Sequence, residues 1–162
     1  MLSRVASHGL SGIDGFCVQV ETDIANGLPA FEIVGLPDAA VRESRERVRA
    51  AVKNAGFLFP AARITVNLAP ADMRKEGSGY DLPLAVGLVA AMGVLPVEAL
   101  KGWFLAGELS LTGDLKPVSG ILPLALAARE SGARGIIVPA GNAAEGAVVR
   151  GLPVVGAGNL AE

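Results

Sequence analysis

The chain has 162 residues and a mass of 16.4 kDa, the size of one folded domain. Apolar residues make up 51% of the sequence and aromatic residues only 4%, which excludes a disordered chain and predicts a largely aliphatic core. The net charge of −2 argues against capture of nucleic acid by overall charge, although it allows a local basic patch. Cys17 is the single cysteine, so an intramolecular disulfide and a cysteine-cluster metal site are excluded. With no secretory leader expected, a reducing cytoplasmic compartment is favoured.

Three strands are predicted at the start of the chain. Residues 2–8 and 15–22 are strand-like, and in the second segment Phe16, Val18 and Val20 share one face at period two. A turn at 26–29 leads to a third strand over 30–34. Together these segments indicate an antiparallel meander.

A charged helix is predicted next. Asp38 is placed to cap a helix that runs through Asn54 and ends before Gly56. Its apolar stripe faces inward, and its predicted outer face carries Arg42, Glu43, Arg45, Glu46, Arg47, Arg49 and Lys53.

The remaining elements predict a mixed fold. A polar, glycine-rich loop over 72–80 precedes a helix capped by Asp81. That helix is apolar on every side, and its uncharged run over 82–97 is too short and too rich in glycine and proline for a membrane span. The other expected elements are a strand at 63–68, a hairpin with arms 104–108 and 110–118 around 112–114, a helix at 120–131, a strand at 135–139, and short strands at Val148-Val149 and Val154-Val155. We therefore predict an α+β or α/β fold with about three helices, in one domain over 1–162.

Common catalytic and cofactor patterns are missing from the sequence. There is no Walker phosphate-binding motif, and the single histidine, His8, has no neighbouring metal-ligand partners and is interpreted as structural. Glu108 is also assigned a structural role, as a hydrogen-bond acceptor, since acid–base catalysis needs a second group within reach. No cofactor or metal is expected in this chain.

Three phrases in order carry a family resemblance. They are Phe31-Glu32-Ile33-Val34-Gly35-Leu36-Pro37-Asp38, then Lys75 to Leu84, then Ala106-Gly107-Glu108-Leu109-Ser110-Leu111-Thr112-Gly113 with Pro117-Val118-Ser119-Gly120. The chain resembles the N-terminal domain of the ComM or YifB family of Mg-chelatase-like AAA+ proteins. More remotely it resembles the proteolytic domain of Lon, which implies a ribosomal protein S5 domain 2-like fold with a mixed sheet.

The Lon resemblance also locates a degenerate catalytic site. Laid on the Lon serine motif K-D-G-P-S-A-G, the stretch Lys75 to Asp81 puts Gly79 at the nucleophile, with Ser78 one residue away. The position of the Lon lysine is taken by Leu122. The resemblance therefore implies a Lon-like fold without the Ser–Lys dyad.

In the resembling family, this domain precedes an AAA+ module, which we expect beyond residue 162 and which would bind ATP and Mg²⁺. The resemblance implies a homohexamer that drives DNA branch migration in natural transformation and recombination. This chain would contact its own AAA+ module and neighbouring subunits, with DNA reached through the whole protein and no membrane involved. It would be noncatalytic, helping to assemble the ring or to guide DNA.

The best candidate surface for such a role is one stripe of the charged helix. Arg42, Arg45, Arg49 and Lys53 are spaced to share one face, where phosphate contacts would be independent of sequence. Two alternatives remain for this face. It could form an intersubunit contact, or it could be a solvated surface stabilised by ion pairs such as Arg42 with Glu46.

Two alternative functions are weighed against this one. A hydrolase would pair Ser78 with Lys75 or Lys116, but both lysines lie in polar segments, where a lysine stays charged and is no base. A stand-alone RNA-binding domain is the other alternative, although Tyr80 is the only aromatic residue placed to stack on a base and is interpreted as a packing residue.

Overall fold

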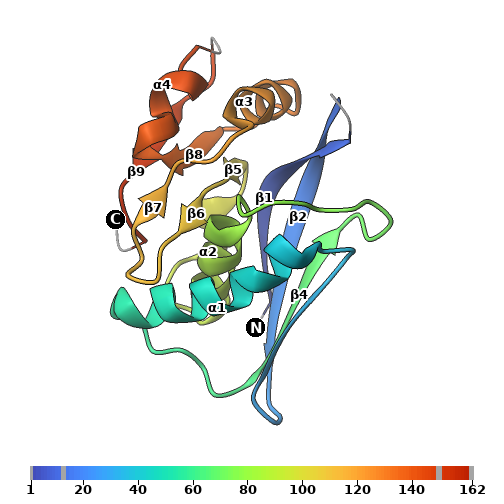
Figure 1. Ribbon diagram of the computed structural model, residues 1–162, viewed down its shortest axis with the longest axis vertical. Helices are drawn as coiled ribbons and strands as arrows, with labels where there is room; N and C mark the ends of the chain where they lie inside the picture. The colour runs from blue at the N-terminus through green and yellow to red at the C-terminus, as the bar shows by residue number, and fades with distance from the viewer. Residues whose placement is uncertain (1, 12–13, 149–150, 161–162) are drawn as a thin grey trace.

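The computed structural model describes residues 2–11, 14–148 and 151–160 (Figure 1). The helices there are α1 (Ala39–Asn54), α2 (Asp81–Ala91), α3 (Ile121–Glu130) and α4 (Ala143–Gly146), with 3-10 turns η1 (Val97–Leu100) and η2 (Ala140–Asn142). The strands are β1 (Leu2–Ser11), β2 (Asp14–Ala25), β3 (Ala30–Val34), β4 (Arg63–Ala69), β5 (Trp103–Leu105), β6 (Glu108–Leu109), β7 (Leu115–Lys116), β8 (Gly135–Pro139) and β9 (Val154–Ala157). The predicted combination of a mixed sheet and helices is confirmed.

One mixed sheet organises the described part of the chain. Its strand order is β3-β4-β2-β1-β5-β8-β9, while β6 and β7 form a separate hairpin. The pairs β1–β2 and β2–β4 are antiparallel, and the other pairs in the large sheet are parallel. The predicted N-terminal meander is wrong for its third strand, since β3 pairs with β4. The helix α1 connects these two strands, and such a crossover makes them parallel.

The sheet separates two layers of core. On one face, Val5, Val18 and Val20 pack with α1 and α2, together with Leu105 of β5. On the other face, Phe104, Ile136 and Val138 pack against the inward residues of α3, which are Ile121, Leu124, Ala125 and Ala128. Neighbouring residues of β5 therefore serve different layers, as the alternation of side chains along a strand requires.

The two central helices form for different local reasons. In α1, the Asp38 side chain accepts a hydrogen bond from the Val41 amide at 2.7 Å, so the predicted cap is confirmed. Helix α2 is apolar around its whole surface and is buried along nearly its full length. The prediction that Asp81 caps α2 is wrong, because Tyr80 holds the cap position and Asp81 is the first helical residue.

The remaining predictions differ from the structure only in detail. The hairpin has shorter arms than predicted, because β6 and β7 form only two register pairs, and the segment 103–105 joins the large sheet instead. Val154 and Val155 lie in β9, whereas Val148 lies in a turn and Val149 falls outside the described residues. Within the described residues, each helix is too short or too polar to cross a bilayer.

Candidate functional site

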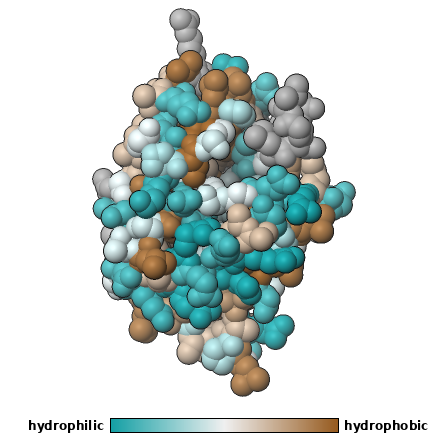
Figure 2. Space-filling view, in the orientation of Figure 1, coloured by the Kyte–Doolittle hydropathy of each residue, from teal (hydrophilic) through white to brown (hydrophobic). Residues whose placement is uncertain are grey.

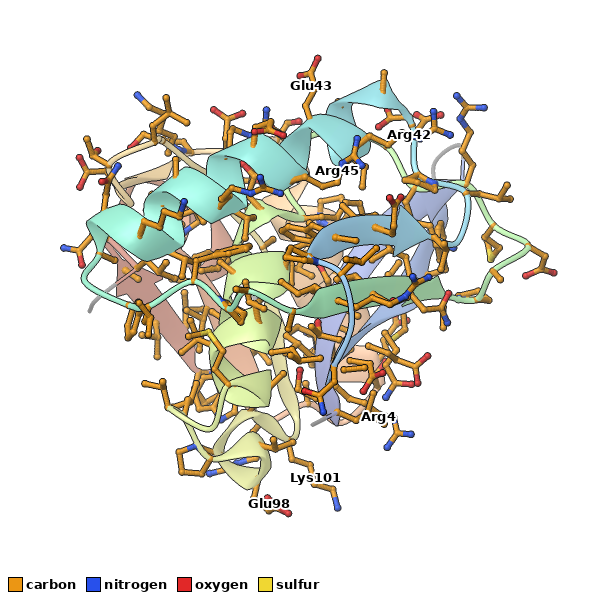
Figure 3. All side chains as sticks on the ribbon, turned by 90° about the horizontal axis from the view of Figure 1, so that it is seen from below. Arg4, Arg42, Glu43, Arg45, Glu98 and Lys101 are labelled. Carbon is orange, nitrogen blue, oxygen red and sulfur yellow. The ribbon has the colours of Figure 1, made fainter. Side chains whose placement is uncertain are left out.

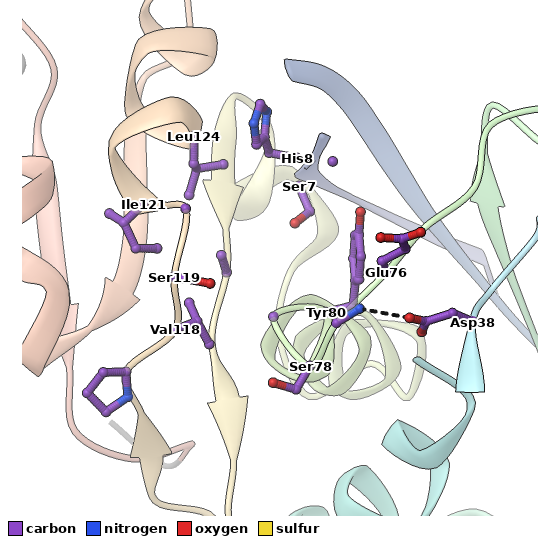
Figure 4. A pocket seen from close by; sticks show the side chains of 16 residues that line it. Ser7, His8, Asp38, Glu76, Ser78, Tyr80, Val118, Ser119, Ile121 and Leu124 are labelled. Atoms are coloured by element: carbon purple, nitrogen blue, oxygen red, sulfur yellow. Dashed lines mark hydrogen bonds between the residues drawn. The ribbon is translucent and has the colours of Figure 1, made fainter. Parts of the chain in front are cut away.

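A cavity of about 620 Å³ lies at the end of β1, between the loop that leads into α2 and the segment that leads into α3 (Figure 4). Residues of β1 and Ala106 contribute to its lining, and two further lining segments, 76–80 and 117–121, are about forty residues apart in the chain. The lining residues are Ser7, His8, Gly9, Asp38, Glu76, Gly77, Ser78, Gly79, Tyr80, Ala106, Pro117, Val118, Ser119, Gly120, Ile121 and Leu124.

The segments aligned with the Lon serine and lysine meet across this cavity. Ser78 and Gly79 line one wall, and Gly120 and Ile121, which immediately precede Leu122, line the other. Leu122 itself is 37% exposed, and its amide donates to Oε2 of Glu145 at 3.0 Å. The two segments that the resemblance aligns with the Lon dyad therefore meet at one cavity, and the aligned residues Gly79 and Leu122 have side chains without a nucleophile or a base.

Lys75 is buried, in contrast to the prediction from its polar loop. Its ammonium donates to the carbonyl oxygen of Gly35 at 2.8 Å and to that of Pro70. Burial lowers the pKa of Lys75, with a smaller opposing influence from Asp72. The side chain thus ties together two turns, and it is absent from the lining of the cavity. Sequence reasoning missed this role because the partners are main-chain carbonyls, which leave no signal in residue types.

Asp81 forms the most completely paired buried charge among the described residues. Its carboxylate accepts from Nε of Arg47 at 2.6 Å, from Nη2 of Arg47 at 3.1 Å, from Oγ of Ser44 and from the Leu109 amide at 3.0 Å. The hydrogen bond to Asp81 raises the pKa of Arg47. Arg47 therefore turns inward, which corrects its predicted place on the outer face of α1. This network joins α1, α2 and β6 directly behind the cavity.

Two polar side chains in the cavity wall have buried atoms without partners. Tyr80 is 3% exposed, and neither its hydroxyl nor the ring nitrogens of His8 have a hydrogen-bond partner among the described residues. Burial raises the pKa of Tyr80, helped by the carboxylates of Asp38 and Glu76, and burial lowers the pKa of His8. Both side chains are therefore neutral at pH 7. Tyr80 was predicted to pack, and it does, as part of the core and of the cavity lining drawn in Figure 4.

The basic stripe of α1 runs along the side of that helix next to the edge strand β3, where Arg45 donates to the carbonyl oxygen of Phe31 at 3.3 Å. Figure 3 shows Glu43 pointing outward from α1 and Arg45 between α1 and β3, and Figure 2 shows hydrophilic residues gathered over this helix. Arg45 approaches Glu32 at 3.8 Å, whereas Arg42 has no carboxylate within 4.0 Å among the described residues, so the pair with Glu46 that we considered is not formed.

An aromatic ring accompanies this stripe. Arg49 and Lys53 lie over Phe59, with 5.4 Å and 5.9 Å from their cationic groups to the ring centroid. They share a hollow of about 270 Å³ with Phe31 and Phe59, so cationic and aromatic groups meet at one end of α1.

The other candidate residues take structural places. Glu108 is half-buried in β6, where its charge contributes to the raised pKa of Arg47. The described side chains include no group of three or more His, Cys, Asp or Glu placed to hold a metal ion. The arrangement as a whole offers a cavity and a basic surface suited to binding.

Comparison with known proteins gives the family. Residues 20–142 match the family model described as subunit ChlI of Mg-chelatase, and the chain belongs to this family. It is 45% identical over 148 residues to competence protein ComM of Haemophilus influenzae, covering 91% of this chain and 29% of that protein. It is also 45% identical over 150 residues to YifB of Escherichia coli, covering 93% and 29%.

Lon protease 2 of Bacillus subtilis is a more distant relative, 27% identical over 119 residues, which cover 70% of this chain and 21% of that protein. This likeness supports the fold assigned from the sequence. The chain spans about a third or less of the length of these curated relatives.

Proposed function

We propose that this chain is the noncatalytic N-terminal domain of a ComM/YifB-like AAA+ ATPase. The observation that carries the proposal is the cavity itself: Gly79, aligned with the Lon nucleophile, lines it, and Leu122, aligned with the Lon lysine, directly follows the lining residue Ile121. A fold retained without its reactive groups is suited to binding or assembly. The AAA+ module of the whole protein would bind ATP and Mg²⁺ and would form a homohexameric ring in the cytoplasm.

Within that ring, the domain guides DNA during branch migration in natural transformation and recombination. The ComM relative is named a competence protein, which supports such a role. The basic stripe of α1 supplies the surface, because Arg42 and Lys53 have no carboxylate partner within 4.0 Å among the described residues and are exposed. Contacts of this kind with phosphate are independent of sequence and weaken as salt rises.

The test compares two sets of variants in the full-length protein. Arg42→Ala, Arg49→Ala and Lys53→Ala together remove three charges of the stripe, while Arg4→Ala and Lys101→Ala remove exposed basic residues elsewhere, as Figure 3 shows. Binding to a branched DNA is measured by fluorescence anisotropy between about 50 and 200 mM salt. We expect the stripe variant to bind more weakly and with a shallower salt slope, by about 0.9 for each lost phosphate contact, and the control to bind as wild type.

Ring assembly, measured by sedimentation on the same variants, separates the two uses of the stripe. Loss of the hexamer with unchanged DNA affinity per subunit would assign the stripe to an intersubunit contact. If neither DNA binding nor assembly changed, α1 would present only a solvated face, and the proposed role would be wrong.

A further inference from the structure

We propose that the cavity at the end of β1 binds an alkylammonium group, carried either by a lysine side chain of a partner segment or by a free polyamine. This site is separate from the basic stripe on α1, so its test does not depend on the role proposed for DNA. Four features of the cavity wall lead to this ligand class. They are its negative charge, its polar atoms without hydrogen-bond partners, its aliphatic side chains, and the hydrogen bonds that hold one wall in place before a ligand binds.

The cavity wall carries two carboxylates and no arginine or lysine among its described lining residues. Each Asp38 oxygen accepts a single backbone hydrogen bond, from Val41 at 2.7 Å and from Gly77 at 3.3 Å, the second drawn in Figure 4. Each oxygen therefore keeps a lone pair for a further donor. The other carboxylate, Glu76, approaches Arg74 at 3.4 Å, but both side chains are about 70% exposed, and such a pair holds its carboxylate weakly.

Two of the described lining residues carry buried polar atoms without partners. The Tyr80 hydroxyl and both His8 ring nitrogens are buried without partners among the described residues, and buried polar atoms are normally hydrogen-bonded. An ammonium group has three N–H donors and no acceptor, so it can donate to the Tyr80 oxygen and to a carboxylate at once. Because Tyr80 and His8 are neutral, neither repels a cation.

The wall opposite these polar groups is apolar. Val118, Ile121 and Leu124 contribute aliphatic side chains to the cavity, and the last two are 1% exposed. An aliphatic stem of about four carbons fits between a charged end and such a wall, as lysine stems do on protein surfaces. An anion would instead be repelled by the two carboxylates, and a purely apolar ligand would leave the Tyr80 hydroxyl unpaired.

The apolar wall is also held in place before any ligand binds. Asn142 is 6% exposed, donates to the Val118 carbonyl at 3.0 Å and accepts from the Val118 amide at 2.9 Å. This two-point clamp fixes the segment that leads into α3. A site that is ordered in advance loses less conformational entropy when a ligand enters.

The test uses three probes on the full chain, followed by amide chemical shifts and calorimetry. The probes are Nα-acetyl-lysine amide, putrescine, and Nα-acetyl-norleucine amide, which keeps the aliphatic stem but has no charge. We expect the two cationic probes to shift amides of the lining segments 76–80 and 117–121, and the neutral probe to bind at least tenfold more weakly. Whichever cationic probe binds more tightly identifies the source, a side chain or a free amine.

Conservative variants keep the proposal falsifiable. We expect Tyr80→Phe, which removes one oxygen, and Glu76→Gln, which removes one charge, each to weaken the cationic probe at least threefold while the thermal unfolding midpoint stays within a few degrees of wild type. Glu98→Gln is the matched control, since Glu98 is an exposed carboxylate, labelled in Figure 3, that does not line the cavity. Equal binding of the norleucine probe, no shift in the lining amides, or wild-type affinity in both variants would overturn the proposal.

Discussion

At the scale of single residues, the buried carboxylate of Asp81 holds together the segments of α1, α2 and β6. Asp81 is 0% exposed and faces Arg47, whose side chain is 22% exposed, so the pair bridges the interior and the surface. The carboxylate also accepts a hydrogen bond from the Leu109 amide. Removing the carboxylate therefore leaves hydrogen-bond donors of both α1 and β6 without a partner. A buried charge is tolerated when all its partners are present. Removing one partner lowers the free energy of unfolding by more than the intact pair adds to it, because the other charge is left buried and unpaired.

Replacing Asp81 by asparagine therefore destabilises the protein strongly. We expect Asp81→Asn to lower the free energy of unfolding by about 3 kcal/mol, measured by urea denaturation, because the Arg47 charge loses its paired carboxylate. Glu43→Gln is the matched control, since Glu43 is the exposed partner of Arg47 at 3.6 Å and should change stability by less than about 0.5 kcal/mol. An unchanged urea midpoint for Asp81→Asn would contradict the structural role of this network.

His8 makes stability depend on pH in the mildly acidic range. Burial lowers its pKa from the ordinary value of 6.5, so below pH 6.5 the unfolded chain binds a proton that the folded chain does not. The contribution of neutral His8 to stability is thus present above pH 6.5 and is lost as the pH falls, by at most about 1.4 kcal/mol per pH unit for one proton.

The comparison with His8→Gln isolates this effect, because His8 is the single histidine of the sequence. Urea unfolding of both proteins from about pH 7.5 to pH 5 should show the wild type losing stability relative to the variant as the pH falls. Parallel pH profiles would mean that His8 titrates alike in both states and is open to solvent.

At the scale of elements, the short segment after β8 fixes the position of the residues that lead into α3. Asn142 lies at the end of η2, and its amide group pairs with both main-chain polar atoms of Val118. The Asn142 side chain therefore supplies Val118 with the two hydrogen bonds that a neighbouring strand would otherwise provide. The cavity wall before α3 therefore depends on an element that follows it by more than twenty residues.

Asn142→Ala tests this dependence. We expect a loss of about 1–3 kcal/mol in unfolding free energy and faster hydrogen exchange at the Val118 amide, because both Val118 groups lose their partners. Asn54→Ala is the control: its amide also donates to a main-chain carbonyl, that of Leu111 at 2.7 Å, but in an exposed position, where the loss should stay below about 1 kcal/mol. Unaltered Val118 exchange in Asn142→Ala would exclude the clamp.

At the scale of the whole molecule, the Lon-like fold brings Ser78 to the cavity without a lysine beside it among the described lining residues. Ser78 lines the cavity, but no described lysine does, and the Lys75 ammonium faces the Gly35 and Pro70 carbonyls. A serine needs an adjacent base to become a nucleophile. The alternative of a displaced Ser–Lys hydrolase therefore has no geometric support among the described residues.

A serine-directed fluorophosphonate should leave this chain unlabelled. Under the same conditions it should label a Lon protease that retains both members of the dyad. Mass spectrometry of the tryptic peptide that contains Ser78 provides the measurement. A stoichiometric phosphonyl adduct on Ser78 would show that the residue is activated and would refute the noncatalytic assignment.

Much of the secondary structure could be predicted from local sequence signals. The Asp38 cap, the apolar stripe of α1 and the uniformly apolar α2 all depend on residues within a few turns of one another. Arg47 left a weak signal as well, since it lies three residues after the buried Ser44 and four before the buried Ala51. That spacing places it at the edge of the inward face, but its partner could not be named, because Asp81 comes from another helix.

The sequence by itself determined the class of fold and most of the helices and strands, and it predicted that Gly79 and Leu122 replace the Lon dyad. The tertiary structure decided that β3 pairs with β4, that Lys75 and Asp81 are buried, and that the loops at Ser78 and Gly120 enclose one cavity. The physical reason is the distance along the chain over which each kind of interaction acts. Caps and periodicity act between neighbours in the chain, whereas strand pairing, desolvation and cavity walls depend on residues brought together from distant segments only when the whole sheet has formed.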